Sequence, residues 1–254
     1  MKQRVISSVF VVLITVLAAY FGGIVLDLTL MFVALYGSYE FINASQKRFD
    51  LLLYILMVLT IIGLYFFNEY HLFFILIEMI LLLSLAVLDE RQSFISVSSV
   101  FMMSLLLGFA LHFMRHVQSI NKWMFGYVII ISYITDTFAY LIGSKIGKHK
   151  LIERISPNKT IEGSLGGWIF GTLISLLWAY YFNFFNMPKY IIIIGSLILP
   201  IVSQIGDLVF SLIKRNYNVK DFSNLIPGHG GILDRLDSNI FCIIVFGTLI
   251  LLLG

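Results

Sequence analysis

The sequence has little charge and almost no cysteine. Only 12% of its 254 residues are Asp, Glu, Lys or Arg, whereas 59% are hydrophobic and the mean hydropathy is +0.96. These values exclude an ordinary soluble globular domain, so the chain is predicted to be an integral membrane protein. Cys242 is the single cysteine and lies in an apolar run, which excludes an internal disulfide and leaves the redox compartment unspecified.

Long polar loops are also missing, so any chemistry must lie in the helices and their connections. Apolar runs of about 17 to 25 residues can cross a bilayer as helices, whereas barrel strands would alternate over short stretches. We therefore predict an all-α, polytopic transmembrane fold of about nine spans, the first being a retained helix rather than a cleaved signal peptide. The spans are expected near residues 5–24, 27–43, 51–67, 70–88, 93–113, 122–142, 162–182, 189–212 and 231–253.

Basic residues are distributed unevenly between the two sides of this map. With the N-terminus inside, 14 of the 17 Lys and Arg residues fall on the cytoplasmic side. Because Lys and Arg are retained in the cytoplasm, the pattern predicts an N-in, C-out protein of the cytoplasmic membrane. The net charge of +3 fits basic loops that face anionic lipid headgroups, and it requires no nucleic-acid partner.

Unusual polar residues concentrate in the C-terminal half. Residues 1–120 are predicted to be transmembrane helices with a scaffold, dimer-forming or lipid-facing role. Residues 121–254 are predicted to be the catalytic region, with a polar site that faces the cytoplasm. Glu40 and Glu78 are isolated in the N-terminal half, and we assign them no role. His71, His112, His116 and His149 are expected to be structural.

Four acids lie at similar depth near the cytoplasmic ends of predicted spans, namely Asp136, Asp207, Asp234 and Asp237. A carboxylate in a membrane is costly unless it is paired, protonated or bound to a cation. Structural ion pairs with Arg235, Lys214 and Lys220 are one explanation. A divalent cation is the other, because the acids outnumber Arg235 at their depth. Mg²⁺ suits hard oxygen ligands and phosphate-bearing substrates.

Two polar segments accompany these acids. In PGHGG, residues 227–231, the glycines allow close approach of a ligand, and a helix whose N-terminus attracts phosphate follows; an ordinary turn is the alternative. His229 fits a phosphate donor, a general acid or a turn residue. In SPNKTIEG, residues 156–163, the polar side chains suit headgroups or a nucleotide, and helix capping by Ser156 or Thr160 is the local alternative.

The stretch SLIKRNYNVKDFSNLIPGHGGILDRLDS, residues 211–238, resembles the signature of the phosphatidate cytidylyltransferase family, also called CDP-diacylglycerol synthases. The signature positions are filled without a gap by Ser211, Lys214, Arg215, Lys220, Asp221, Pro227, Gly228, His229, Gly230, Gly231, Asp234, Arg235 and Asp237. SQIGD (203–207), DTFAYLIG (136–143) and SPNKTIEG are also similar to family motifs. The N-terminal half matches only in hydropathy.

This resemblance implies transfer of CMP from CTP to phosphatidate in phospholipid biosynthesis, with CDP-diacylglycerol and pyrophosphate as products. It also implies a homodimer and a divalent-metal site at Asp207 and Asp234, which we expect to hold Mg²⁺, with a second cation as an option. Asp237 would hold Arg235 or a metal-bound water, and Asp136 is a further candidate ligand. Lys214 and Arg215 are expected to act as catalytic counter-charges. The expected substrate-binding residues are Lys159, Ser203, Gln204, Lys220, Asp221, Gly228, His229, Gly230, Gly231 and Arg235.

Two other functions share part of this pattern. A membrane transporter also uses intramembrane acids and glycine-interrupted helices, but its site is expected near the midplane, often between inverted repeats. Here the acids lie toward one end of their spans, and the sequence shows no second copy of the motif. A CTP-dependent polyprenol or other lipid kinase would need similar cations while transferring the γ-phosphate instead of CMP.

Overall fold

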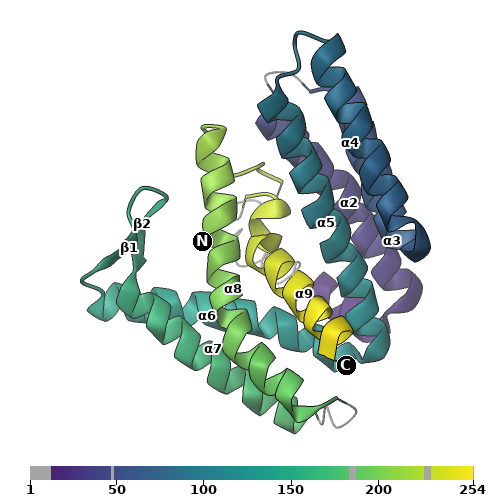
Figure 1. The fold of residues 1–254 in the computed structure, drawn as a ribbon. Coiled ribbons are helices and arrows are strands. Elements are labelled where there is room, and N and C mark those ends of the chain that lie inside the picture. Colours follow the sequence, from purple (N-terminus) through teal and green to yellow (C-terminus); the bar gives the residue numbers. More distant parts are fainter. Residues whose placement is uncertain (1–12, 47–48, 183–186, 226–229, 254) are drawn as a thin grey trace. The chain divides into compact units, whose positions relative to one another are not determined.

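The computed structural model describes residues 13–46, 49–182, 187–225 and 230–253, and most of these residues are helical. The chain divides into two compact units. The helices and strands of both are labelled in Figure 1. The first unit contains residues 1–115 and 219–235, and the second contains residues 116–218 and 236–254. The polar connection 219–235 therefore groups with the N-terminal helices, although it is remote from them in sequence.

The first unit is built from apolar helices that pack on one another in chain order. They are α2 (Gly23–Ser45), α3 (Leu51–Phe66), the short helix η1 (Asn68–Tyr70), α4 (His71–Leu88) and most of α5 (Phe94–Ile120). α2 packs on α3, and α3 packs on α4. Leu26, Phe41, Met57 and Ile61 are almost fully buried in this unit. In a membrane, where lipid is as apolar as these side chains, close van der Waals packing rather than the hydrophobic effect holds such helices together.

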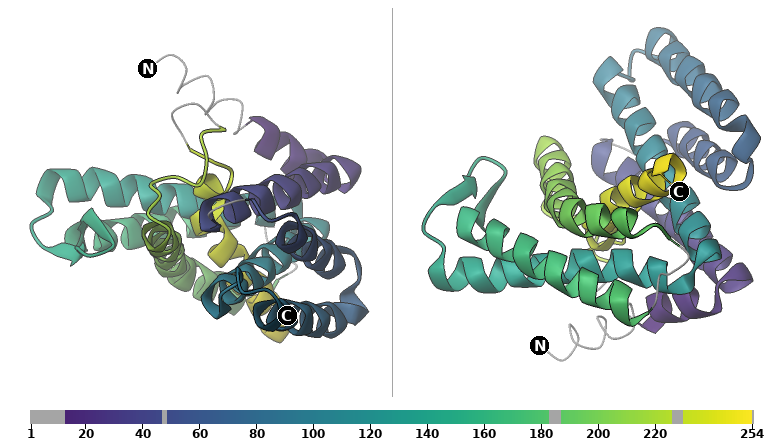
Figure 2. Two further views of the ribbon diagram at one scale, coloured as in Figure 1. Left: turned by 90° about the horizontal axis from the view of Figure 1, so that it is seen from above. Right: turned by 60° about the horizontal axis from the view of Figure 1, so that its bottom comes forward.

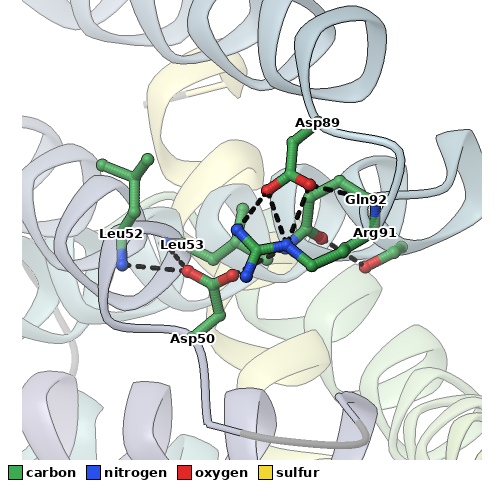
Figure 3. A network of polar contacts seen from close by, with 7 residues as sticks. Asp50, Leu52, Leu53, Asp89, Arg91 and Gln92 are labelled. Atoms are coloured by element: carbon green, nitrogen blue, oxygen red, sulfur yellow. Dashed lines mark hydrogen bonds and ion pairs between the residues drawn. The ribbon is translucent and has the colours of Figure 1, made fainter.

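A polar network joins the start of α3 to the turn after α4 (Figure 3). Asp50 caps α3, because its Oδ1 accepts hydrogen bonds from the backbone amides two and three residues further on, at 3.0 and 3.1 Å. Its Oδ2 accepts from Gln92 Nε2 at 2.6 Å. In the turn after α4, hydrogen bonds from Arg91 hold the pKa of Asp89 at about 2. These contacts fix where α3 begins and where the chain turns from α4 into α5.

The second unit contains α6 (Lys122–Ile146), the strands β1 (Lys150–Ile152) and β2 (Ser156–Thr160), α7 (Ile161–Tyr181), α8 (Lys189–Asn216) and most of α9 (Leu233–Leu253). α6 and α7 lie side by side, and the hairpin of β1 and β2 connects them (Figure 2). Gly163 and Gly167 of α7 face α6, and an added Cβ would lie only 2.5 and 2.6 Å from backbone oxygens of α6. Small residues at this spacing permit close helix contact.

The hairpin positions the start of α7. Its strands are antiparallel, with Lys150 opposite Thr160 and Ile152 opposite Ser156. Thr160 is the N-cap of α7, and its side chain accepts from the Gly163 amide at 3.1 Å, which confirms the capping alternative for this residue. The hairpin itself is an addition to the predicted all-helical fold.

Seven helices in the described part of the chain are long and apolar enough to span a membrane. They are α2, η1 with α4, α5, α6, α7, α8 and α9, whereas α3, with 16 residues, is shorter. The polytopic helical class is thus confirmed, and the count of nine spans stays a prediction. The expected first span, 5–24, lies partly outside the described residues, although residues 13–21 are helical. α5, α6 and α8 run past the predicted ends at 113, 142 and 212.

Candidate active site

An ion pair joins two of the candidate residues in the second unit, Lys159 and Asp207. Lys159 stands at the end of β2, directly before the N-cap of α7, so the hairpin fixes its backbone. Asp207 lies on α8, and the Ser211 hydroxyl one turn later donates to its Oδ1 at 3.3 Å. The structure therefore brings together one predicted substrate-binding residue and one predicted metal ligand.

Asp136 and Asp237 are the two further predicted acids of the second unit, and Asp136 lies within electrostatic reach of the pair. Asp136 of α6 accepts a hydrogen bond from the Ser238 hydroxyl of α9 at 3.3 Å. The charges of Asp207, Asp237 and Lys159 all act on the Asp136 carboxylate. Three carboxylates from three helices thus share one electrostatic neighbourhood with one lysine. That balance is negative, as a site for a divalent cation requires.

The chemistry of these groups fits magnesium. Carboxylate oxygens are the hard ligands that Mg²⁺ prefers, and a typical Mg²⁺ site uses one or two carboxylates together with waters and substrate phosphates. In the part of the chain that the structure describes, no three His, Cys, Asp or Glu side chains are gathered as ligands of one ion. A site completed by substrate phosphates does not need such a cluster. The pairing of Asp207 with Asp234 stays a prediction.

Asp234 belongs to the first unit and is only 6% exposed. Its Oδ2 accepts two backbone hydrogen bonds, from Phe222 at 2.8 Å and from Gly231 at 2.9 Å. Gly230 has a φ of +81°, in the left-handed region that favours glycine, and an added Cβ would lie 2.8 Å from Asp234 Oδ2. The Asp234 carboxylate therefore closes the segment that leads into α9.

Glu40 is a functional candidate that our sequence analysis missed. This residue of α2 is fully buried, and its carboxylate accepts from Ser223 Oγ at 2.6 Å and from the amides of Ile232 and Leu233, each at 2.9 Å. A signal was available, because an ionisable residue inside a membrane span is a functional candidate by default. The partners lie more than 180 residues further along the chain, so the sequence did not identify them.

The other predicted residues have varied surroundings. Gln204 donates to Ser164 O and Pro200 O at 3.2 Å each, and so links α8 to α7, while Ser203 is buried on α8. Lys214 is buried in the last turn of α8, and the neighbouring Arg215 is exposed. Lys220 and Asp221 are exposed in the connection that follows α8. Predictions for Gly228 and His229 fall outside the described residues.

Arg235 carries a donor that needs an acceptor. Within the described ranges, its Nε is buried and has no hydrogen-bond partner. A buried donor left unpaired is costly, and a guanidinium suits phosphate oxygens in particular. By contrast, the amide of Gly231 already donates to Asp234, so this part of the glycine-rich segment is engaged by the protein itself.

Apolar spanning helices, with acids and basic residues gathered near their ends, define a polytopic membrane protein suited to anionic, phosphate-bearing substrates. The model of the Cytidylyltransferase family matches residues 2–253. The chain therefore belongs to this family. It is 34% identical to a phosphatidate cytidylyltransferase of Staphylococcus aureus (strain COL) and 32% identical to that of Staphylococcus haemolyticus, in each case over 99% of both chains. The counterpart from Staphylococcus epidermidis is 30% identical over the same share.

Proposed function

We propose a mechanism for the reaction of this chain, which transfers CMP from CTP to phosphatidate and forms CDP-diacylglycerol and pyrophosphate. The observation that carries the reaction is the family match over nearly the whole chain, together with the ungapped signature from Ser211 to Asp237. In the reaction, a phosphatidate oxygen attacks the α-phosphorus of CTP in line. The bond to the bridging oxygen breaks, and pyrophosphate leaves with that oxygen and its negative charge.

Counter-charge is the main catalytic demand, because two anions must meet and the leaving group gains charge. Phosphatidate is already ionised near neutral pH, so no strong general base is required and His229 is not given that role. A magnesium ion, when bound, would neutralise and align the phosphates. We expect Asp207 and Asp234 to hold it, with Asp237 supporting Arg235 or a metal-bound water and Asp136 adding negative charge nearby.

Basic residues of this chain would bind the phosphates directly. Lys214, Arg215 and Lys220 lie at and after the end of α8, where the triphosphate of CTP is expected to arrive. The unpaired Nε of Arg235 supports a phosphate contact at the start of α9. Lys159 is positioned to exchange its ion pair with Asp207 for a substrate phosphate.

The location of the substrates agrees with the predicted topology. CTP is dissolved in the cytosol, and phosphatidate is anchored in the leaflet. A site at the cytoplasmic ends of the spans would reach both, and the excess of Lys and Arg on that side supports an N-in, C-out orientation. Membrane lipid and a second copy of the chain are the further partners that we propose.

A labelled-product assay tests the reaction. Purified protein in detergent is incubated with phosphatidate and CTP carrying its label either on cytosine or on the γ-phosphate. Cytidylyl transfer puts the cytosine label into the lipid fraction and leaves the γ-label in soluble pyrophosphate. Appearance of the γ-label in lipid, tested in parallel with a polyprenol acceptor, would identify a lipid kinase and refute the proposal.

A further inference from the structure

Glu40 places a carboxylate inside the first unit. It is fully buried in α2, and among the described residues it takes part in no ion pair. Its compensation comes from the Ser223 hydroxyl and from the amides of Ile232 and Leu233 at the start of α9. A helix N-terminus stabilises an anion through its free amides and its dipole. Here the anion is the carboxylate of Glu40, which belongs to α2.

Glu40 and Asp234 both accept hydrogen bonds from the two ends of the connection between α8 and α9, at residues 222–223 and 231–233. Glu40 joins Ser223 to the amides of residues 232 and 233, and Asp234 joins the Phe222 amide to the Gly231 amide. The base of the connection, residues 222–223 and 231–233, is therefore fastened twice. We call this arrangement the double clamp.

Glycines make room for both carboxylates of the double clamp. An added Cβ at Gly231 would collide with the Glu40 carboxylate, and one at Gly230 would lie 2.8 Å from Asp234 Oδ2. On α2, an added Cβ at Gly37 would lie 3.3 Å from Leu233 Cδ2, which leaves little space for any larger residue. The glycine pair before α9 and the glycine one turn before Glu40 thus serve one contact between α2 and the start of α9.

We propose that Glu40 is a positioning residue for cytidylyl transfer, because its clamp on the start of α9 fixes the Asp234 carboxylate. The inference rests on the proposed function of Asp234 at the cation and phosphate site. Asp234 Oδ2 is oriented by two backbone amides, and the amides that follow are held by Glu40. Loss of Glu40 would free the base of the connection and let Asp234 leave its orientation. Glu40 itself touches no reacting atom.

The test compares Glu40→Gln with Glu78→Gln. Glu78 is a matched control, because it is another buried Glu of the first unit, 1% exposed, and its carboxylate accepts from Ser104 on α5 rather than from the connection. The two readouts are hydrogen exchange of peptides covering residues 220–235 in metal-free protein and the Mg²⁺ concentration for half-maximal turnover. Groups that orient metal ligands typically change metal affinity or activity about 10- to 100-fold when replaced.

We expect Glu40→Gln to accelerate exchange in residues 220–235 and to raise the half-maximal Mg²⁺ concentration about 10- to 100-fold. Glu78→Gln should change neither, even if it lowers the melting temperature. Equal exchange and equal Mg²⁺ dependence in the two variants would overturn the positioning role. A Glu40→Gln variant in which only the melting temperature falls would overturn it as well.

Ser223→Ala provides a second test if Glu40→Gln does not fold. It removes one hydroxyl from the double clamp and leaves the buried carboxylate in place, so we expect a smaller shift of about threefold or more in both readouts, in line with the net contribution of one ordinary hydrogen bond. Unchanged readouts would refute the proposal. Wild-type protein that does not transfer the cytosine label to phosphatidate would instead refute the proposed function, whatever the variants show.

Discussion

Lys159 and Asp207 form an ion pair that is suited to exchange rather than to holding the fold. Each side chain is 27% exposed, and in the proposed topology the pair lies near the cytoplasmic membrane boundary, where water would screen the attraction. Pairs of this kind contribute about 0 to 1 kcal/mol to stability. We therefore expect the lysine to move to a substrate phosphate, and the carboxylate to turn to the cation, at little cost to the folded structure.

Replacement of Lys159 tests this interpretation. Lys159→Met should lower kcat about 100-fold, as expected for loss of one preorganised counter-charge, and change the melting temperature little. The matched control is Lys150→Met on the other strand of the hairpin, where the ammonium group donates to Pro157 O. Steady-state kinetics of both variants decide the question, because a role in the hairpin fold alone would make the two variants equally active.

Asp207 and Asp234 should both be essential for turnover but differ in their effect on stability. Asp207→Asn and Asp234→Asn remove the charge at constant size, and each should lose nearly all activity. Asp207→Asn should leave the melting temperature almost unchanged, because its ion pair is partly exposed. Asp234→Asn should destabilise by about 1.5 to 3 kcal/mol, since a buried carboxylate that accepts two amide bonds loses its charge.

Turnover against Mg²⁺ concentration, with thermal melting as the folding control, measures these effects. The double variant should be scarcely worse than either single one, because members of one catalytic unit are not additive. Asp237→Asn should lower turnover less than either of these single variants. Near-normal turnover in either single variant at Asp207 or Asp234 would rule out the shared-metal mechanism.

Among the elements, the helices were predictable and the hairpin was not. Long apolar runs specify α4 or α8 locally, because most residues of such a run are apolar and favour the bilayer. Residues 150–160 contain Lys150, Pro157 and Lys159 in two very short strands, without the alternation that indicates a strand. Their pairing depends on the ends of α6 and α7, which the hairpin joins. Local sequence therefore gives no sign of it.

The candidate site residues could be selected from the sequence by their type, but their contacts could not be predicted. The motifs identified Asp136, Asp207 and Lys159, because unusual polar residues in an apolar chain are conspicuous. The bonds from Glu40 to residues 232 and 233 span 192 and 193 positions, and no local periodicity encodes such a pairing. The same holds for Lys159 and Asp207, which are 48 positions apart.

The end of α8 presents two basic residues that should act mainly on CTP. Lys214 and Arg215 occupy its last turn, where cations are also favoured by the helix dipole. Replacement of either by Gln should raise the apparent KM for CTP about tenfold or more and leave that for phosphatidate nearly unchanged, as for loss of a charge-assisted hydrogen bond. Initial rates with each substrate varied in turn test this. A larger change for phosphatidate would assign the residues to the lipid.

On the scale of the whole molecule, the family signature is divided between the two structural units. Ser211, Lys214 and Arg215 belong to the second unit, and the stretch from Lys220 to Arg235 belongs to the first. The helix α9 begins in the first unit and continues in the second. A catalytic region of residues 121–254 would accordingly contain parts of both units, and Glu40 shows that the N-terminal helices contribute buried polar contacts as well.

The orientation of the chain can be tested across a single helix. Lys150 and Lys189 are exposed and flank α7, so if this helix spans the membrane the two positions lie on opposite sides, whatever the total number of spans. Cysteine replaces each lysine in a background without Cys242, and intact cells are treated with a membrane-impermeant thiol reagent. The excess of Lys and Arg predicts that position 189 is labelled and position 150 is protected until the cells are opened. Equal labelling of both positions would contradict a transmembrane α7, and labelling of position 150 alone would reverse the orientation and place the candidate active site away from cytosolic CTP.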